Sequence, residues 1–416
     1  MLASHSPEYP ILKNALISQG SIKECFYTMR ITGSYSISTT IGESVRAFVP
    51  DALPPRNPAL APESYVEANR LAELALARLS GVSGLVPSVD WLLYSAIRKE
   101  ALLTSQIEGT QATLADLFDE EAGFAVSNTA DVEEVTNYLR AFRYVQDNLR
   151  RVEGLPLSVR LLCEAQRLLM TGARGLAKQP GELRRSQNWI GGTRPGNAVF
   201  VPPPPERVPD LLADIERFIH AQSDVENIDA AVLPPLVKTA LIHLQFETVH
   251  PFLDGNGRIG RLLIGALLEH WGLLPEPLMV LSGYLKRHQA EYYRCLSAVR
   301  TEGDWERWVA FFLDAVIHAA SEAERNIVAI ATLLAADRRH LLASAKAGPA
   351  SYRLFELLPL MPRFTVEQVR QKLGTSFPTA NAAVGILAEL EIVAEVSGQK
   401  KNRSYSYQRY IALLAE

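Results

Sequence analysis

A glycine-rich loop between two predicted helices constrains this chain more than any other segment. The loop spans residues 250–261 and has the sequence His-Pro-Phe-Leu-Asp-Gly-Asn-Gly-Arg-Ile-Gly-Arg. Apolar residues recur at helical spacing over 236–244 before it and over 259–267 after it. Pro234-Pro235 and Gly272 are typical of the outer ends of these helices. The sequence therefore predicts a helix-loop-helix joint inside a mainly helical fold.

Two side chains of this loop suit chemistry on a phosphate ester. His250 titrates near neutral pH, so it can accept a proton from an attacking hydroxyl group. Asp254 offers a hard oxygen ligand of the kind that Mg²⁺ prefers when substrate phosphates share the ion.

The rest of the loop predicts an anion-binding site. Gly255 and Gly257 permit backbone conformations that direct N–H groups towards one point, at the positive end of the second helix. Arg258 and Arg261 are three residues apart on that helix and suit bidentate contacts with phosphate oxygens. Together with the base and the carboxylate, this set favours a nucleotide site.

Other readings account for parts of the loop. Residues 255–260 match the G-x-G-x-x-G dinucleotide fingerprint, but that motif must follow a β-strand, and here it follows a helix. His243, Glu247 and His250 share a helix face and could bind metal, as in the E-x-x-H motif of di-iron bundles, although such sites need a second E-x-x-H helix. An incidental surface turn would explain each residue singly but not the whole combination.

At every specified position, residues 250–261 resemble the signature of the Fic family, H-P-F-x-[DE]-G-N-G-R-x-x-R. Most Fic proteins transfer AMP from ATP to a Ser, Thr or Tyr hydroxyl of a target protein, and others transfer UMP, phosphate or phosphocholine or remove AMP. The resemblance implies a helical Fic core with a β-hairpin flap, His250 as the general base and Asp254 as the Mg²⁺ ligand. It also implies ATP contacts from Asp254, Gly255, Asn256, Gly257, Arg258, Ile259, Gly260 and Arg261.

A second segment resembles the inhibitory motif of the same family, [ST]-x-x-x-E-[GN]. Thr104, Glu108 and Gly109 occupy its defining positions, after a helical stretch that starts near Ser88. The resemblance implies that Glu108 pairs with Arg261 and keeps the γ-phosphate of ATP from binding productively. A 100-fold repression needs only about 2.7 kcal/mol, which one such pair can supply.

Two further segments are candidates for substrate contacts. Residues 189–190 and 199–201 are short β-prone runs around a Gly/Pro/Asn-rich turn, and Pro202 follows them, which predicts an edge hairpin. By resemblance to the Fic flap, Ile190, Gly191, Gly192 and Thr193 border the nucleotide and the target; the alternative is a hairpin without a ligand. Tyr292 and Tyr293 resemble a tyrosine pair near the adenine of related proteins, and helical geometry lets at most one of them stack.

Composition sets the wider limits. The net charge of -4 over 416 residues gives no global basic field for nucleic acid. Cys25, Cys163 and Cys295 are scattered and odd in number, which fits a reducing compartment, and no segment resembles a signal peptide or a membrane span. We expect a cytoplasmic protein and a homodimer. The stretch from Met29 onwards looks more like a family N-terminus, so residues 1–28 are interpreted as an upstream extension.

The chain divides into five predicted segments. Residues 1–62 form an extended arm, 63–150 a helical region with the inhibitory motif, 151–330 the Fic catalytic core, 331–345 a linking helix and 346–416 a winged helix-turn-helix domain. The last segment has nine Lys/Arg and six Asp/Glu, with Lys400, Lys401 and Arg403 clustered in the wing. Contact with DNA and contact with protein fit it equally well. Two hypotheses follow: an autoinhibited protein adenylyltransferase that uses ATP and Mg²⁺, or a DNA-binding regulator with a nucleotide-sensing or inactive Fic module.

Overall fold

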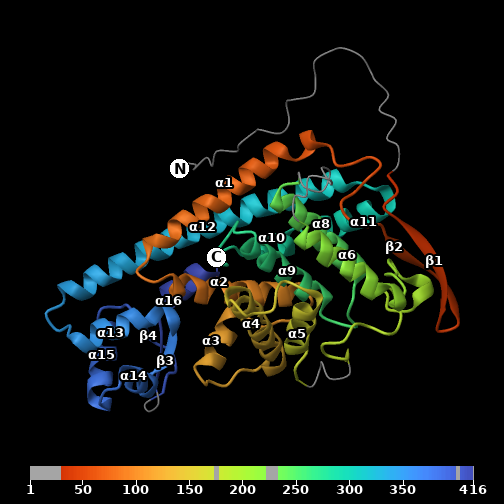
Figure 1. The fold of residues 1–416 in the computed structure, drawn as a ribbon. Helices are drawn as coiled ribbons and strands as arrows, with labels where there is room; N and C mark the ends of the chain where they lie inside the picture. Colours follow the sequence, from red (N-terminus) through yellow and green to blue (C-terminus); the bar gives the residue numbers. More distant parts are fainter. Residues whose placement is uncertain (1–29, 173–177, 222–232, 400–402, 416) are drawn as a thin grey trace, which may run out of the picture.

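The computed structural model of the chain describes residues 30–172, 178–221, 233–399 and 403–415. Within this part, helices dominate, and the mainly α class predicted from the sequence is confirmed (Figure 1). One cluster of buried apolar side chains runs from Val49 near the N-terminus to Leu414 near the C-terminus. The two ends of the described chain therefore share a core with the central helices.

The predicted loop lies between two of the helices that precede the C-terminal elements, α8 and α9. The helices that precede the C-terminal elements are α1 (Val66–Val82), α2 (Val89–Ile107), α3 (Leu114–Glu121), α4 (Thr129–Arg150), α5 (Val159–Leu169), α6 (Val208–His220), α8 (Pro235–Val249), α9 (Asn256–His270), α10 (Leu281–Arg287), α11 (Gln289–Glu302) and α12 (Trp305–Ala343). Short 3₁₀ turns are η1 (Pro62–Ser64), η2 (Ser83–Leu85), η4 (Pro195–Asn197), η5 (Pro205–Arg207) and η6 (Leu358–Leu360). Local signals start several helices: the Ser88 side chain caps α2, and Thr113 with Asp116 forms a capping box on α3.

Helix α12 is the longest element, with 39 residues. It crosses the body, and the shorter helix α1 lies beside part of it (Figure 1). The predicted boundary between the core (151–330) and a separate linking helix (331–345) falls inside α12, because the apolar stripe of this helix continues through Ile327, Ile330 and Leu334.

Residues 33–50, expected as part of an extended arm, form a β-hairpin instead. Strand β1 (Gly33–Thr40) pairs antiparallel with β2 (Glu43–Pro50). The two turn residues, Ile41 and Gly42, both have positive φ (52° and 75°), as a type I′ hairpin turn requires. On β2, burial alternates as far as Ala47, with Val45 and Ala47 buried, and Phe48 and Val49 are then buried on both faces. Residues 1–29 of the predicted arm lie outside the described residues.

The described C-terminal elements are three helices, three short strands and a final helix. They are α13 (Pro349–Leu357), β3 (Arg363–Thr365), α14 (Val366–Leu373), α15 (Phe377–Glu389), β4 (Ala394–Glu395), β5 (Ser404–Ser406) and α16 (Gln408–Ala415). The strands form an antiparallel sheet in the order β3-β5-β4. Of the basic wing cluster, Lys400 and Lys401 lie outside the described residues, and the Arg403 guanidinium lies 5.8 Å from the centre of the Tyr405 ring.

This C-terminal unit packs on the helices that precede the loop. The Tyr410 hydroxyl donates to the Trp91 carbonyl on α2 (3.4 Å), and Gln368 Nε2 donates to the Ala122 carbonyl after α3 (3.0 Å). Arg363 also forms an ion pair with Asp119 of α3. The unit and the β1–β2 hairpin lie at opposite ends of the molecule (Figure 1).

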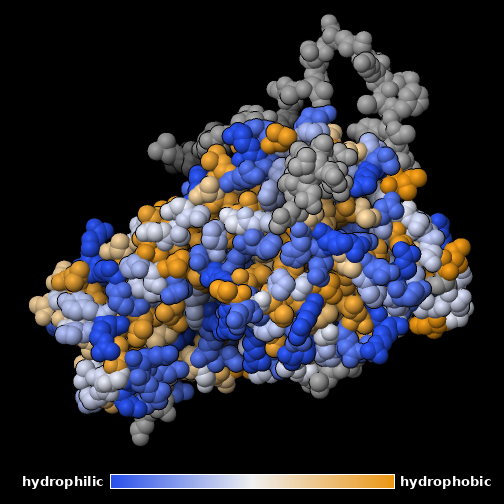
Figure 2. Space-filling model, viewed as in Figure 1, coloured by the Kyte–Doolittle hydropathy of each residue, from blue (hydrophilic) through white to orange (hydrophobic). Residues whose placement is uncertain are grey.

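Figure 2 shows a surface on which polar and apolar side chains are mixed, with apolar residues at the edge where the β1–β2 hairpin projects. Among the described residues, every helix is too short or too polar to cross a lipid bilayer.

Candidate active site

The predicted loop joins α8 to α9 as a sharp turn. The backbone of His250 ends α8 in the left-handed conformation (φ 48°, ψ 62°), and its N–H donates to the Phe246 carbonyl at 3.0 Å. The Asn256 side chain closes the turn, since its Oδ1 accepts from Phe252 N–H and its Nδ2 donates to the Phe252 carbonyl, both at 2.8 Å. Gly255 has φ 81° and precedes α9, so the turn uses the conformational freedom of glycine there. Ile259 and Gly260, in the first turns of α9, are buried.

A buried arginine that sequence reasoning missed fixes this turn. The Arg184 side chain is 2% exposed and donates to the carbonyls of His250 (2.9 Å), Val249 (3.3 Å) and Pro203 (2.5 Å). Its own backbone N–H donates to the Pro251 carbonyl at 2.9 Å. Arg184 therefore satisfies the carbonyls at the end of α8 and ties them to the segment after residue 200. No periodicity or motif in the sequence pointed to it.

The His250 ring is neutral at physiological pH. Burial lowers the pKa of His250 to about 4, and the positive charge of Arg184 acts in the same direction. The ring can therefore accept a proton.

The inhibitory motif and the loop meet as predicted. Glu108 ends α2, and its Oε1 accepts from Arg261 Nη2 at 2.5 Å. Thr104 holds the same guanidinium, with its hydroxyl oxygen 2.6 Å from Arg261 Nε and its carbonyl 3.1 Å from Nη2. Gly109 follows with φ 105° and lets the chain leave the helix. The Arg261 side chain is 2% exposed and that of Glu108 is 35% exposed, so the guanidinium is buried and the carboxylate stays partly open to water.

Arg261 keeps the Glu108 carboxyl group ionised. Burial alone would raise the pKa of Glu108, but the charge and the hydrogen bond of Arg261 outweigh it and hold this pKa below its usual value. The carboxylate also lies against the start of α9: a methyl group placed on Gly257 would come within 2.4 Å of Glu108 Oε1. Glu108 thus occupies the place that an anion would need beside Gly257 and Arg261.

The remaining charged residues of the loop form a second set of contacts. Arg258 pairs with Glu134 (3.2 Å) and with Asp254 Oδ1 (3.4 Å), and its Nε has no partner among the described residues. Asp254 Oδ1 also accepts from Gly255 N–H at 2.6 Å. The Asp254 side chain is 42% exposed, so its carboxylate is open to a ligand. Within the described ranges there is no cluster of three or more Asp, Glu, His or Cys side chains that could bind a metal ion by themselves.

The predicted flap is less regular than a two-stranded hairpin. A single antiparallel bridge joins Ile190 and Phe200, because Gly191 and Gly192 have positive φ values (68° and 74°) that turn the backbone out of a strand. Thr193 N–H donates to Asn197 Oδ1 at 3.0 Å and leads into η4. The edge expected to be free is partly covered, because Phe48 of β2 donates its N–H to the Val201 carbonyl at 3.0 Å.

The two tyrosines of α11 have different environments. Tyr292 is 1% exposed, and its hydroxyl lies 2.8 Å from His243 Nε2, while His243 Nδ1 lies 3.1 Å from the Gly260 carbonyl. Both ring nitrogens of His243 are therefore occupied, which argues against its use as a metal ligand. Tyr293 is 48% exposed, so only this ring of the pair offers a face to a base, and stacking on it stays a prediction.

Glu247 is a buried carboxyl group one turn before His250. Burial raises the pKa of Glu247 to about 7, and its Oε1 has no partner within the described chain. The pKa of this carboxyl group is 4.5 in an open chain and about 7 in the folded protein. The folded state therefore holds the proton to higher pH than the unfolded state, and the free energy of unfolding falls as pH rises from 4.5 to 7.

Glu247→Gln should therefore stabilise the protein at pH 8 by roughly 2–3 kcal/mol and change little at about pH 3, where the Glu247 carboxyl group is neutral in both the folded and the unfolded state. Thermal unfolding at the two pH values, with exposed Glu153→Gln as the control, measures the difference. An equal or lower melting temperature for Glu247→Gln at pH 8 would contradict the assignment.

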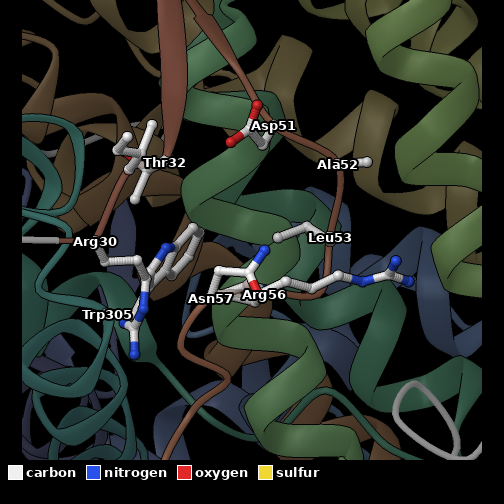
Figure 3. A pocket seen from close by; sticks show the side chains of 10 residues that line it. Arg30, Thr32, Asp51, Ala52, Leu53, Arg56, Asn57 and Trp305 are labelled. Atoms are coloured by element: carbon white, nitrogen blue, oxygen red, sulfur yellow. The ribbon is translucent and has the colours of Figure 1, made fainter. Parts of the chain in front are cut away.

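A cavity of about 540 Å³ lies at the base of the β1–β2 hairpin (Figure 3). Its lining includes Arg30, Asp51, Arg56 and Trp305 and none of the residues of the loop or of the inhibitory motif. Arg30 is already bound to Glu306 at 2.8 Å. The cavity is thus separate from the site described above.

Comparison with known proteins gives two family matches. Residues 66–147 match the model described as Fic/DOC family N-terminal, and residues 156–268 match the model described as Fic/DOC family. Curated relatives include "Protein adenylyltransferase Fic" of Drosophila erecta, 28% identical over 211 residues, and of Drosophila ananassae, 27% identical over 214 residues. These alignments cover 50% and 51% of this chain and 38% of each relative, so the chain matches well under half of the relatives' length.

Solved structures agree with the fold. A Fic family protein from Desulfovibrio desulfuricans G20 superposes with a TM-score of 0.53 at 23% identity, over 84% of this chain and 97% of that one. A Fic domain containing signaling protein from Bacteroides thetaiotaomicron VPI-5482 gives a TM-score of 0.50 at 20% identity, over 62% of this chain and 97% of its own. At these identities the likeness establishes the fold.

Proposed function

Since the chain carries both parts of a Fic/DOC family protein, the N-terminal region and the Fic domain, we propose that it is an autoinhibited protein adenylyltransferase. It transfers AMP from ATP to a Ser, Thr or Tyr hydroxyl of a target protein, or of itself, and releases pyrophosphate. The observation that carries the proposal is a neutral His250 next to the start of α9, where Glu108 binds Arg261 beside Gly257 and Arg258 pairs with the partly exposed Asp254. That combination supplies a base and an anion site within one turn.

In this reaction the loop supplies the base and the groups that bind the phosphates. His250 takes the proton of the target hydroxyl while the hydroxyl oxygen bonds to the α-phosphorus, and the bond from that phosphorus to the pyrophosphate oxygen breaks. The N–H groups at Gly255 and Gly257, together with Arg258 and Arg261, stabilise charge on the phosphates.

Mg²⁺ fits one position of this site. The Asp254 carboxylate is open to a ligand, and an ion held by one carboxylate and substrate phosphates is the usual Mg²⁺ arrangement, which suits a site without a larger acidic cluster. The ion would neutralise phosphate charge there. Ile190 to Thr193 and Tyr293 are the proposed contacts with nucleotide and target.

Glu108 provides the inhibition. Its carboxylate binds Arg261 and lies against Gly257, so a γ-phosphate cannot use Arg261 until Glu108 moves away. The cost of separating this ion pair sets the degree of repression.

Transfer is tested with ATP labelled at either the α- or the γ-phosphate, Mg²⁺ and the Glu108→Gly chain. Label on protein from α-labelled ATP alone supports transfer of AMP. Label from the γ-position alone would instead indicate phosphate transfer, and the absence of both would contradict the proposal.

The pH dependence of transfer should follow His250. A protonated ring cannot accept a proton, and a pKa of about 4 keeps the ring neutral to lower pH than an ordinary histidine. For Glu108→Gly, kcat/KM should therefore stay level from pH 7.5 to about 5.5, because this parameter reports the free enzyme. An acid limb centred near pH 6.5 would contradict the low pKa.

The C-terminal unit is the basis of the rival function, a DNA-binding regulator. Helix α15, which would enter a groove, contains no Lys or Arg, and its exposed positions include Phe377, Pro378 and Ala382. These residues suit a protein contact better than phosphates. We propose a cytoplasmic homodimer with protein contact at this unit, tested by light scattering. Salt-sensitive DNA binding without any label on protein would favour the regulator.

A further inference from the structure

A strip of apolar and basic side chains runs from the β1–β2 hairpin to the flap. Tyr35, Ile37, Arg46, Phe200 and Arg300 form it, and we name it the hairpin–flap face. In the β1–β2 register, Tyr35 lies opposite Phe48 and Ile37 opposite Arg46, so these side chains share one side of the hairpin. Tyr35 is 49% exposed and Ile37 is 75% exposed.

At the outer end of the face, Arg46 lies on an aromatic ring. Its guanidinium is 4.5 Å from the centre of the Tyr35 ring, which in turn lies 5.4 Å from the Phe48 ring. Arg46 is exposed and forms no ion pair with any described residue. A stacked guanidinium keeps its N–H edge available for a carboxylate.

The inner end repeats this arrangement next to the flap. The Phe48 ring lies 6.4 Å from the Phe200 ring, and the Arg300 guanidinium is 3.8 Å from the centre of Phe200. Arg300 Nε donates to the Leu296 carbonyl at 3.0 Å, which fixes the stem of the side chain. Across the described segments no carboxylate lies within ion-pair distance of it, although most buried arginines here, such as Arg98 and Arg258, are paired.

The hairpin and the flap are joined, so the face is continuous. Phe48 N–H donates to the Val201 carbonyl, and Glu43 binds both the Arg194 side chain and Gly196 N–H (2.7 Å) at the flap tip. The carboxylate of Glu43 is thereby neutralised, which leaves the two stacked arginines as the uncompensated charges of the face.

The inner end of the face lies close to the catalytic base. Phe200, on which Arg300 stacks, bridges to Ile190 of the flap, and Asn188 next to this bridge donates its Nδ2 to the Phe252 carbonyl of the loop at 3.2 Å. A polypeptide that lies along the flap towards His250 would therefore pass Arg300. From Arg46 to Arg300 the contacts run through three rings, a path that about six residues of an extended chain would cover at 3.3 Å per residue.

We propose that the hairpin–flap face binds an acidic, extended segment of the target protein, in which carboxylates near the acceptor hydroxyl bind Arg300 and, further along, Arg46. The proposal rests on the proposed function, because it assigns the target class of that same site. Carboxylates are favoured because neither arginine has an ion-pair partner among the described residues, and the exposed Tyr35 ring and the partly exposed Phe200 ring suit the apolar parts of the segment.

Peptide binding tests the proposal without depending on transfer. The probe is a fluorescein-labelled peptide with one central Ser flanked on both sides by Asp, and its control carries Asn in place of each Asp. Fluorescence anisotropy with the full Glu108→Gly chain should give binding at least about tenfold tighter for the Asp peptide at low salt. Adding R46Q and R300Q should reduce the ratio of the two dissociation constants, Asn peptide over Asp peptide, below about threefold. Adding R56Q, which replaces an exposed arginine outside the face, should leave this ratio unchanged.

Each other outcome overturns the proposal. Equal binding of the Asp and Asn peptides would do so, as would an unchanged ratio in the R46Q/R300Q chain whose melting temperature equals that of its parent. Loss of dimers in that chain, with no preference for Asp, would show that a second copy occupies the face. Labelling from α-labelled ATP is followed in parallel: if the Asp preference is present and no peptide or protein is labelled, the proposed function fails while the binding face stands.

Discussion

Replacing Glu108 by glycine should raise ATP-dependent labelling of the protein on the order of 100-fold. The substitution removes the carboxylate that binds Arg261 and lies against Gly257. The γ-phosphate of ATP can then bind the Arg261 guanidinium and occupy the space beside Gly257. A hydrogen bond to a charged group contributes about 1.5–3 kcal/mol, and a 100-fold change corresponds to about 2.7 kcal/mol. Initial rates of label incorporation from α-labelled ATP measure the effect.

The matched control for this variant is Glu153→Gly, which removes an exposed carboxylate from a loop. It should leave the rate unchanged. Thr104→Ala should give a smaller increase than Glu108→Gly, because it removes one hydrogen bond to Arg261 and leaves the ion pair. Equal rates for Glu108→Gly and the parent chain would contradict the inhibitory role.

Replacing His250 by alanine in the Glu108→Gly background should reduce transfer by about 100- to 10,000-fold, the usual contribution of a general base. Affinity for ATP should change little, because the loop arginines and glycines that would hold the phosphates belong to α9 and the turn before it. Single-turnover labelling gives the rate, and ATP binding is measured separately by calorimetry.

His318→Ala is the control for this second variant, since the His318 side chain is 60% exposed on α12. It should leave both quantities unaltered. A His250→Ala chain that labels its target at the parental rate would remove His250 from the proposed mechanism. If His250→Ala loses ATP binding together with transfer, His250 maintains the structure of the turn and is not the general base.

The loop and the inhibitory motif could be predicted because their information is local. Twelve consecutive residues specify the turn, and the helical spacing on both sides specifies where it lies. The pairing of Glu108 with Arg261 joins positions 153 residues apart, and only the resemblance to a family motif could predict it. The structure has the pair at 2.5 Å.

What could not be predicted depends on contacts between distant segments. Arg184 looks like an ordinary surface residue in the sequence, yet three carbonyls from α8 and the flap surround it. Tyr292 and Tyr293 are adjacent and chemically alike, and only the packing against His243 decides which is buried. The β1–β2 hairpin did carry a local signal in its alternating pattern, which the proline-rich stretch after it obscured.

The most direct test of the central claim is the intact mass of the purified protein after incubation with ATP and Mg²⁺. An autoinhibited adenylyltransferase predicts that Glu108→Gly gains the mass of one or more AMP groups, that the parent chain gains little and that Glu108→Gly/His250→Ala gains none. Unchanged masses in all three, with ATP bound to each, would show a nucleotide-binding module that transfers nothing and would contradict the account.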